Sequence, residues 1–229
     1  MKPIIKICGI TSDACVDTCV SLGIETIGLN FYPPSPRSVS LEQARYLRRR
    51  LPHTVHTVGV FVRPDVDFLS RAVQEVGLDA VQLHGTDPAY WVDFRPPPVP
   101  LWLAQGVHSR EDIETAKLQF RLLRSMNVTA TAILLDAKVS GAHGGTGKLA
   151  PWDIIAQTVM EVPILLAGGL NPDNVRDAVL EVKPAGVDVA SGVESRPGLK
   201  DPLKVAEFQR HALVGWKRLQ ELQKSQYSQ

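Results

Sequence analysis

Short runs of apolar residues alternate along the chain with longer amphipathic stretches, and this alternation predicts strands that are each followed by a helix. Several of the short runs are almost continuously apolar, as is typical of strands covered on both faces. We expect eight strands, at residues 4–8, 26–31, 57–61, 80–85, 101–107, 131–137, 163–169 and 186–191. Eight such units in one chain indicate the α/β class and a single (β/α)8 TIM barrel.

The barrel prediction extends over the whole chain, because no linker or second domain interrupts residues 1–229. From about residue 224 the chain is polar, and a frayed C-terminal tail is expected there. A doubly wound open sheet is the alternative architecture. It usually needs fewer strands, and no GxGxxG motif follows the first apolar run.

Residues that cap helices stand at the start of several amphipathic stretches. We expect helices to begin after Thr11 or Ser12, after Ser40, after Ser109, and at the prolines that follow Asn171 and Asp201. Ser40 has Gln43 three residues later, which is the spacing of a capping box. The fourth helix must be short, because the prolines within residues 95–100 forbid a helix there.

Composition and charge exclude several classes of protein. The chain has 229 residues, 44% hydrophobic and 21% charged, with a formal net charge of +1. That charge gives no electrostatic case for binding nucleic acid or an anionic membrane. No apolar run approaches the roughly 18–20 residues that span a bilayer, and the N-terminus does not resemble a secretory signal. We therefore expect a cytoplasmic protein, and its sequence leaves open whether it is a monomer or a homodimer.

The three cysteines are Cys8, Cys15 and Cys19, and their odd number and close spacing argue against a disulfide framework. A reducing compartment is the simpler interpretation. Cys15 and Cys19 are four residues apart and share one face of a helix, a spacing that could hold a metal ion. No matching Cys/His pair completes a tetrahedral set, so packing against the sheet is the favoured alternative and no metal site is expected.

The first strand carries an unusual pair of residues at its end. Successive strand residues point to opposite faces, so Lys6 and Cys8 point one way and Ile5 and Ile7 the other. The isoleucines suit the side that the helices cover, which places Lys6 and Cys8 inside the barrel. A lysine there needs a partner, and its ammonium group favours the thiolate form of a nearby cysteine. Catalysis by Cys8 and inert packing of a buried cysteine both remain open.

Two further charged residues stand where the active sites of barrels lie, at the C-terminal ends of strands. Asp136 ends the apolar run at 131–137, either as an ion-pair partner of Lys6 or another strand-end cation, or as a general acid in apolar surroundings. Arg37 is the one cation in the proline-stiffened loop at 32–38. A thiol and a carboxyl group at one barrel mouth would form an acid/base pair.

Glycines after the last two strands predict a phosphate site. Gly168 and Gly169 leave backbone N–H groups open to close approach, and Ser191 and Gly192 do the same after the eighth strand. A short helical turn near Gly192 would point its positive end at an anion. Tight corners without a ligand are the alternative. A separate glycine-rich segment at 141–148 lacks the Walker spacing, and a lid is its favoured interpretation, with Lys148 as a surface charge.

An ordered set of motifs at the strand ends resembles a known family over nearly the whole chain. The motifs are KICG (6–9), FYPPSPRSVS (31–40), VGVF (58–61), VQLHG (81–85), LLD (134–136), GGTG (144–147), LAGGLNPDNV (166–175) and DVASGVESRPGLKD (188–201). Together they resemble the phosphoribosylanthranilate isomerases of tryptophan biosynthesis. The resemblance implies an Amadori rearrangement of N-(5-phosphoribosyl)anthranilate, an aldose-to-ketose isomerisation, without a metal or organic cofactor.

The resemblance also implies roles for individual residues. Cys8 corresponds to the general base that removes the C2′ proton, and Asp136 to the general acid that protonates the furanose ring oxygen. Arg37 corresponds to the cation that faces the anthranilate carboxylate. The phosphate site corresponds to Gly168, Gly169, Ser191 and Gly192, and Asp188 to an aspartate near the substrate.

Three other functions remain as alternatives. An isomerase of the histidine-pathway type acts on a related phosphoribosyl substrate, but that family typically uses two aspartates and has two similar halves. A lyase barrel that forms a Schiff base would have to use Lys6. A barrel that binds phosphate without catalysis would not need Cys8, Asp136 and Arg37 together.

Overall fold

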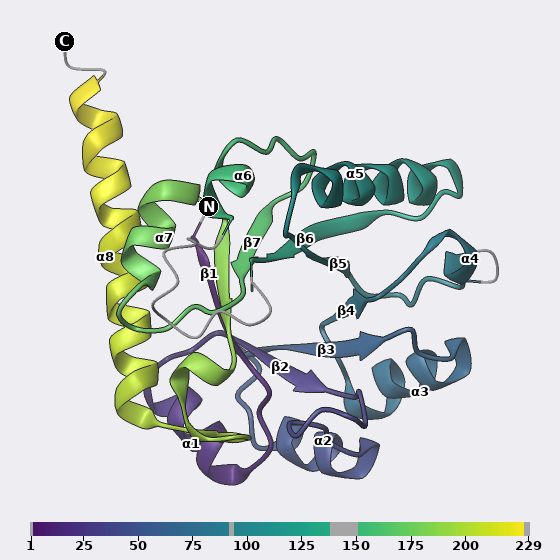
Figure 1. Ribbon diagram of the computed structural model, residues 1–229. Helices are drawn as coiled ribbons and strands as arrows, with labels where there is room; N and C mark the ends of the chain where they lie inside the picture. Colours follow the sequence, from purple (N-terminus) through teal and green to yellow (C-terminus); the bar gives the residue numbers. More distant parts are fainter. Residues whose placement is uncertain (1, 92–93, 138–150, 227–229) are drawn as a thin grey trace.

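The computed structural model describes residues 2–91, 94–137 and 151–226. The segment 141–148, expected as a lid, and Lys148 lie outside the described residues. Eight parallel strands close into a barrel, each hydrogen-bonded to the next and the last to the first (Figure 1). They are β1 Ile4–Cys8, β2 Thr26–Asn30, β3 His56–Val62, β4 Ala80–His84, β5 Leu101–Gly106, β6 Ala130–Asp136, β7 Ile164–Ala167 and β8 Gly186–Val189. The (β/α)8 prediction is confirmed, and the open-sheet alternative is wrong.

Helices surround the barrel. They are α1 Asp13–Ser21, α2 Leu41–Arg49, α3 Val66–Val76, α4 Pro88–Trp91, α5 Arg110–Ser125, α6 Trp152–Ala156, α7 Val175–Val182 and α8 Pro202–Gln226. The short α4 agrees with the proline argument. The long α8 packs against α7 and α1 and continues past the body of the molecule (Figure 1). It stays helical through Gln226, so only the last residues of the expected frayed tail lie outside the described part of the chain.

Two of the predicted helix caps form in the structure, at Ser40 and at Asp201. Ser40 caps α2, because its hydroxyl accepts a hydrogen bond from the Gln43 N–H at 3.1 Å. Asp201 likewise accepts from the backbone N–H groups of Leu203 and Lys204 at the start of α8. Each cap satisfies backbone donors that have no partner in the first helical turn.

The predicted helix start at Asn171 is wrong. α7 begins four residues later, at Val175. The Asn171 side chain accepts hydrogen bonds from the N–H groups of Asp173 and Asn174 at 2.8 and 3.2 Å, which fold the segment into a turn. An asparagine before a proline favours a turn as readily as a helix cap, and here a turn precedes the helix in the chain.

A segment between β8 and α8 was not predicted. It consists of the 3-10 helix η1 Ser191–Val193 and a small antiparallel hairpin of β9 Glu194–Arg196 and β10 Leu199–Lys200. The helical turn expected near Gly192 is therefore confirmed, but the hairpin is too short for hydrophobic periodicity to reveal it. It sits beside the barrel mouth and carries two buried charged residues.

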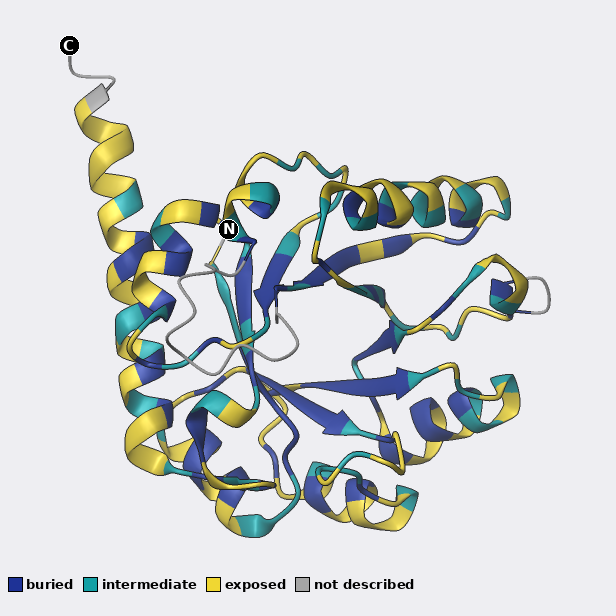
Figure 2. Ribbon diagram, in the orientation of Figure 1, coloured by how far each residue is buried: buried dark blue, intermediate teal, exposed yellow. Residues whose placement is uncertain are grey.

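Figure 2 shows that the barrel strands are largely buried. Their apolar residues separate into two sets, one facing the helices and one inside the barrel. Ile7 packs with the helix-facing core, whereas Ile4, Leu134 and Leu165 belong to the small interior cluster. Because side chains alternate along a strand, Lys6 and Cys8 share the interior face with Ile4. The predicted orientation of β1 is confirmed.

Cys15 and Cys19 pack as small apolar residues. Both are fully buried in the helix-facing core and neither forms a disulfide. The backbone N–H of Lys200 donates to the Cys15 sulfur at 3.4 Å, so this cysteine also supports the hairpin. Within the described residues no group of three or more His, Cys, Asp or Glu side chains could hold a metal ion.

Within the same residues, no helix combines the length and the apolar character that a bilayer crossing requires.

Candidate active site

Lys6 is a fully buried lysine whose partner is Asp188. Its Nζ donates to the Asp188 carboxylate at 2.8 Å, and the two residues are Cα partners in neighbouring strands β1 and β8. Burial alone would lower the pKa of Lys6, but Asp188 and then Cys8 raise it, and the net shift is upward. Lys6 is therefore an ammonium ion at neutral pH. The sequence had left Asp136 open as this partner, and the structure assigns the pair to Asp188.

Cys8 lies at the end of the same strand, and 8% of its surface is exposed. Burial raises the pKa of its thiol, Lys6 lowers it and Asp188 raises it again, so the net shift is upward. Lys6 does favour the thiolate, as expected, but in the free protein its effect on the pKa of Cys8 is outweighed. Asp188 already neutralises the ammonium ion, and burial outweighs what remains of its effect.

Gly28 on β2 makes room for this group. It is the Cα partner of Cys8, and a Cβ at this position would lie 2.7 Å from the Cys8 sulfur and 3.2 Å from Lys6 Cε. A side chain there would displace one or both residues. The interior of the barrel is therefore shaped around the two side chains of β1.

Asp136 and His84 end two other strands at the same mouth. The pKa of His84 is lowered by burial first and by Lys6, while Asp188 and Asp136 act in the opposite direction. The imidazole is therefore neutral at neutral pH, and it lies within electrostatic range of both carboxylates. A hydrogen bond of 2.7 Å joins its Nε2 to the Gln82 side chain, whose Oε1 is buried and has no partner among the described residues.

Arg37 reaches the mouth from the loop after β2. Its Nε and Nη2 donate to the two carboxylate oxygens of Glu194 at 2.8 and 2.6 Å, and one fifth of its side chain is exposed. The Arg37 stem passes over Gly9, which has φ 78°, and a Cβ at Gly9 would lie 2.6 Å from Arg37 Cδ. The glycine after Cys8 thus allows the arginine to lie against the end of β1.

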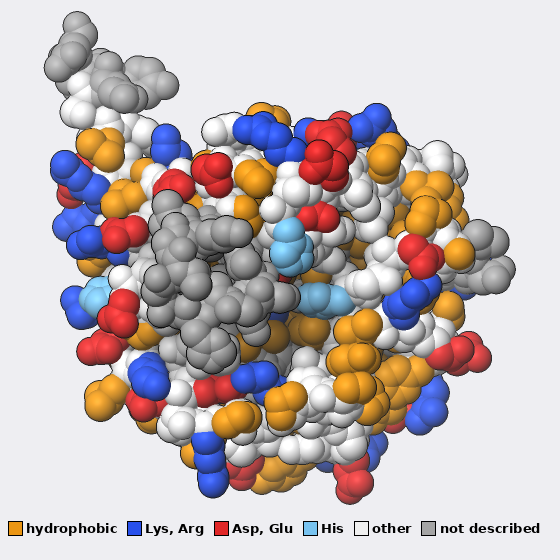
Figure 3. Space-filling view, viewed as in Figure 1, with side chains coloured by type: hydrophobic (Ala, Val, Ile, Leu, Met, Phe, Trp, Pro, Cys, Tyr) orange, Lys and Arg blue, Asp and Glu red, His pale blue; other side chains and the backbone are white. Residues whose placement is uncertain are grey.

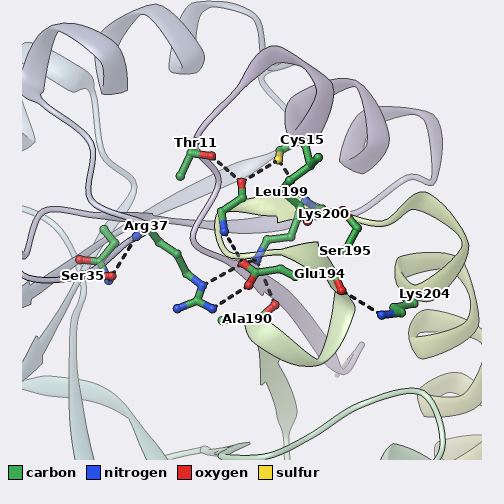
Figure 4. Close-up of polar contacts among 12 residues, drawn as sticks. Thr11, Cys15, Ser35, Arg37, Ala190, Glu194, Ser195, Leu199, Lys200 and Lys204 are labelled. Carbon is green, nitrogen blue, oxygen red and sulfur yellow. Dashed lines mark hydrogen bonds and ion pairs between the residues drawn. The ribbon is translucent and has the colours of Figure 1, made fainter.

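Glu194 pairs with this arginine and Lys200 pairs with Glu194 (Figure 4). Sequence reasoning missed both residues. Lys200 is fully buried; its Nζ donates to Glu194 at 2.8 Å and to the carbonyl of Ala190 at 3.0 Å. Burial alone would raise the pKa of Glu194, but hydrogen bonds from Arg37 and Lys200 outweigh burial and lower it. Three charged residues therefore form one network at the rim.

The glycines of the expected phosphate site lie in two adjacent loops. Gly168 and Gly169 have φ values of 90° and 66°, and their N–H groups have no acceptor in the described part of the chain. A Cβ at Gly192 would lie 1.9 Å from the carbonyl oxygen of Leu170, so the η1 turn with Ser191 packs directly on the loop after β7. The two loops are brought together as predicted.

These groups gather at the end of the barrel where the strands finish. Figure 3 shows two histidines near the middle of this face, with Lys or Arg and Asp or Glu side chains close together beside them. A separate cavity of about 530 Å³ lies near the first residues of β1 and β2, and its described lining contains no candidate residue. Its lining is mostly apolar, and it plays no part in the chemistry that follows.

Comparisons with known proteins decide the family. The family model described as N-(5′-phosphoribosyl)anthranilate (PRA) isomerase matches residues 5–211 of this chain. The chain belongs to the phosphoribosylanthranilate isomerase family. An N-(5′-phosphoribosyl)anthranilate isomerase of Magnetococcus marinus is 40% identical over 204 residues, which are 89% of this chain and 92% of that protein.

Solved structures agree with this family. The crystal structure of the phosphoribosylanthranilate isomerase of Thermotoga maritima has a TM-score of 0.78 at 36% identity and covers 93% of this chain and 99% of its own. A second isomerase was crystallised with reduced 1-(o-carboxyphenylamino)-1-deoxyribulose 5-phosphate. It has a TM-score of 0.74 at 33% identity, with coverage of 93% and 99%.

Membership of the phosphoribosylanthranilate isomerase family separates the remaining alternatives. It argues against a histidine-pathway isomerase and against a barrel that binds phosphate without catalysis. A Schiff-base lyase would need a neutral, accessible Lys6 amine, whereas Lys6 is fully buried, paired with Asp188 and raised in pKa. A protonated amine has no lone pair to attack a carbonyl group, so Lys6 has an electrostatic role instead.

Proposed function

We propose that the chain converts N-(5-phosphoribosyl)anthranilate into 1-(2-carboxyphenylamino)-1-deoxyribulose 5-phosphate, with Cys8 and Asp136 as the acid/base pair. The observation that carries the proposal is the meeting of the two strand ends at one barrel mouth, in a chain of the isomerase family. Two proton-transfer groups at one mouth match a reaction that consists of proton transfers.

Asp136 starts the reaction in this proposal. It gives a proton to the furanose ring oxygen, the C1′–O bond breaks, and the nitrogen lone pair forms a C1′=N double bond. The substrate is then an open-chain iminium ion, and Asp136 is a carboxylate. The positive charge makes the hydrogen on C2′ more acidic.

Cys8 removes that hydrogen as a proton. The C–H electrons form a C1′=C2′ double bond, and the C1′=N electrons return to nitrogen as a lone pair. Ketonisation of the resulting enol transfers a proton from the 2′-hydroxyl group to C1′ and yields the ketose. Cys8 accepts this proton in its thiolate form. Because the pKa of Cys8 is raised, the thiol is the main form in the free protein and must first release its own proton to solvent. The positive charge of the adjacent iminium ion favours the thiolate that results.

The other residues of the mouth hold the substrate in this proposal. Arg37 binds the anthranilate carboxylate, and the loops with Gly168, Gly169, Ser191 and Gly192 bind the phosphate group. Asp188 stands near the reacting sugar while it neutralises Lys6. Anchors at both ends of the substrate place C2′ and the ring oxygen between the two catalytic groups, and such positioning supplies a large part of catalysis.

The rearrangement is redox-neutral and moves only protons, so we expect it to proceed without a metal ion or organic cofactor. We also expect a cytoplasmic enzyme with a small-molecule substrate and neither a nucleic-acid nor a membrane partner. Light scattering after size exclusion distinguishes the monomer from the homodimer, both of which are compatible with a site built from one chain.

The direct test is an assay on freshly prepared phosphoribosylanthranilate in D2O, with Cys8→Ser as a control. The proposal expects the ketose product to carry deuterium at C1′, because C2′ loses its hydrogen as a proton and C1′ gains one. NMR of the product measures this. Product without deuterium would show that the proton removed from C2′ is returned to C1′ without exchange, and would contradict the step in which C1′ takes its proton from the 2′-hydroxyl group.

The carboxylate assignment has its own test. Arg37→Lys keeps the charge but loses the planar fork that binds a carboxylate through two hydrogen bonds. We expect weaker binding of ligands that contain anthranilate and unchanged binding of inorganic phosphate, measured by inhibition constants. Equal losses for both ligands would assign Arg37 to the phosphate group or to the fold.

A further inference from the structure

We propose that Glu194 and Lys200 are positioning residues for Arg37: Glu194 orients the guanidinium group, and Lys200 restores the positive charge that Glu194 would cancel. The inference rests on the proposed function and goes beyond it. It assigns a second layer of residues, on the β9–β10 hairpin, to recognition of the substrate carboxylate.

The hydrogen-bond geometry leaves one edge of Arg37 available. A guanidinium group has five N–H donors in a planar fork. Glu194 accepts from Nε and Nη2, at 2.8 and 2.6 Å, and thus occupies the side of the group. The edge formed by Nη1 and the second hydrogen of Nη2 has no acceptor in the described part of the chain. That edge offers two parallel donors, which is the arrangement that a second carboxylate accepts.

The charge count explains why a lysine is buried beside this pair. Arg37 and Glu194 alone sum to zero, and such a pair would have no net attraction for an anion. Lys200 donates to the same Glu194 carboxylate at 2.8 Å and brings the network to one net positive charge. One bound carboxylate neutralises that charge. The network is therefore matched in charge to a ligand with a single carboxylate at this end.

The hairpin makes the network rigid and joins it to the phosphate side. The Gly198 N–H donates to Glu194 at 3.3 Å, and Lys204 donates to the Glu194 carbonyl at 2.9 Å. Lys200 also donates to the carbonyl of Ala190, the residue before Ser191 (Figure 4). The same buried ammonium group thus contacts the support of Arg37 and the start of the η1 turn.

Two variants separate orientation from charge. Glu194→Gln combined with Lys200→Met removes one charge of each sign, so the network keeps one net positive charge and no buried charge is left unpaired. Arg37 then lacks its oriented support, and we expect KM for phosphoribosylanthranilate to rise about tenfold, with a smaller change in kcat. Lys200→Met alone keeps the Arg37–Glu194 pair but removes the net charge, and KM is expected to rise as well.

A third comparison asks whether the effect passes through Arg37. In an Arg37→Ala background the double change is expected to raise KM by less than about twofold, because coupled residues are not additive. Asp79→Asn is the matched control. Asp79 accepts hydrogen bonds from Thr57 near the opposite end of the barrel, so its loss should lower the melting temperature and leave KM unchanged.

The outcomes distinguish this inference from the proposed function. No turnover by the wild-type chain would overturn both. Normal wild-type turnover with an unchanged KM in the double variant would overturn the inference alone. The inference would also be overturned if the double change raised KM by the same factor in the presence and in the absence of Arg37. Glu194 and Lys200 would then act independently of the arginine.

Discussion

The barrel mouth contains two buried ion-pair groups that are built from the same kinds of residue and differ in their charge balance. Inside the barrel, Lys6 and Asp188 form a pair of one cation and one anion beside Cys8. At the rim, Arg37 and Lys200 share the single anion Glu194. The inner group is neutral and leaves Cys8 as a thiol, whereas the rim group keeps a positive charge. The count of charges decides which group attracts an anion from solution.

The largest expected effect concerns the inner group. Cys8→Ala should lower kcat by roughly 10²–10⁴-fold, the range of general-base catalysis, with a much smaller change in KM. The reason is that proton abstraction matters in the transition state and not in substrate binding. Steady-state kinetics measure both constants. Near-normal turnover would mean that Cys8 only fills space, and the inner group would then have no general base.

Two aspartates at the mouth should separate into a structural and a catalytic one. Asp188→Asn leaves the buried Lys6 ammonium without its counter-charge and should cost roughly 3–5 kcal/mol of unfolding free energy. Asp136→Asn keeps the Lys6 pair, so we expect a folded protein that binds a product analogue and is almost inactive. Denaturant unfolding and activity of both variants test this. A strong loss of stability in Asp136→Asn, with activity retained in the folded fraction, would overturn the general-acid assignment.

Gly9 connects the two groups, and a matched glycine isolates its contribution. Gly9→Ala meets both a left-handed backbone and the Arg37 side chain at 2.6 Å, whereas Gly77→Ala meets a similar φ of 74° with no atom within 4 Å. Backbone strain of about 1–2 kcal/mol applies to both. Only Gly9→Ala should also raise KM, because it displaces Arg37. A similar KM in both variants would show that the arginine adjusts without loss.

The smallest effect is a difference in pH dependence between the groups. The folded pKa of Glu194 lies below its ordinary value of 4.5, so its stabilisation is present above 4.5 and is lost as pH falls through the folded value. The pKa of Lys6 is raised above 10.5, so its stabilisation is present below 10.5 and is lost as pH rises through the folded value.

Unfolding free energies across pH check this assignment. Glu194→Gln combined with Lys200→Met should flatten the acid side of the stability curve, and Lys6→Met combined with Asp188→Asn the alkaline side. An unchanged acid side in the first variant would mean that Glu194 titrates as it does in the unfolded chain.

The sequence was informative where a residue's role depends on its own strand. Alternation along residues 4–8 placed Lys6 and Cys8 inside the barrel, and the strand order brought Asp136 to the same end. The identity of the Lys6 partner could not be derived, because it depends on the register between β1 and β8. Local patterns contain no information about which of several strand-end carboxylates lies opposite a given lysine.

The rim network was beyond sequence reasoning for a related reason. Arg37 and Glu194 are 157 residues apart, and Glu194 lies on a three-residue strand with no periodic signal. The motif at 188–201 was visible, but nothing in it distinguishes a buried lysine such as Lys200 from a solvated one. The net shift of the Cys8 pKa could not be derived from the sequence either, because burial and Asp188 act against Lys6 in a way that only the packed structure defines.

The Lys6–Asp188 ion pair has a consequence for synthesis of the protein. The two residues are 182 positions apart and belong to the first and last strands of the barrel. A ribosome that adds about 5–20 residues per second needs roughly 10–40 s to make the second residue after the first. During that time β1 has no neighbour on one side, and its lysine has no counter-ion. The Lys6 ammonium group therefore stays without this counter-ion until β8 emerges, and the barrel mouth cannot be completed before then.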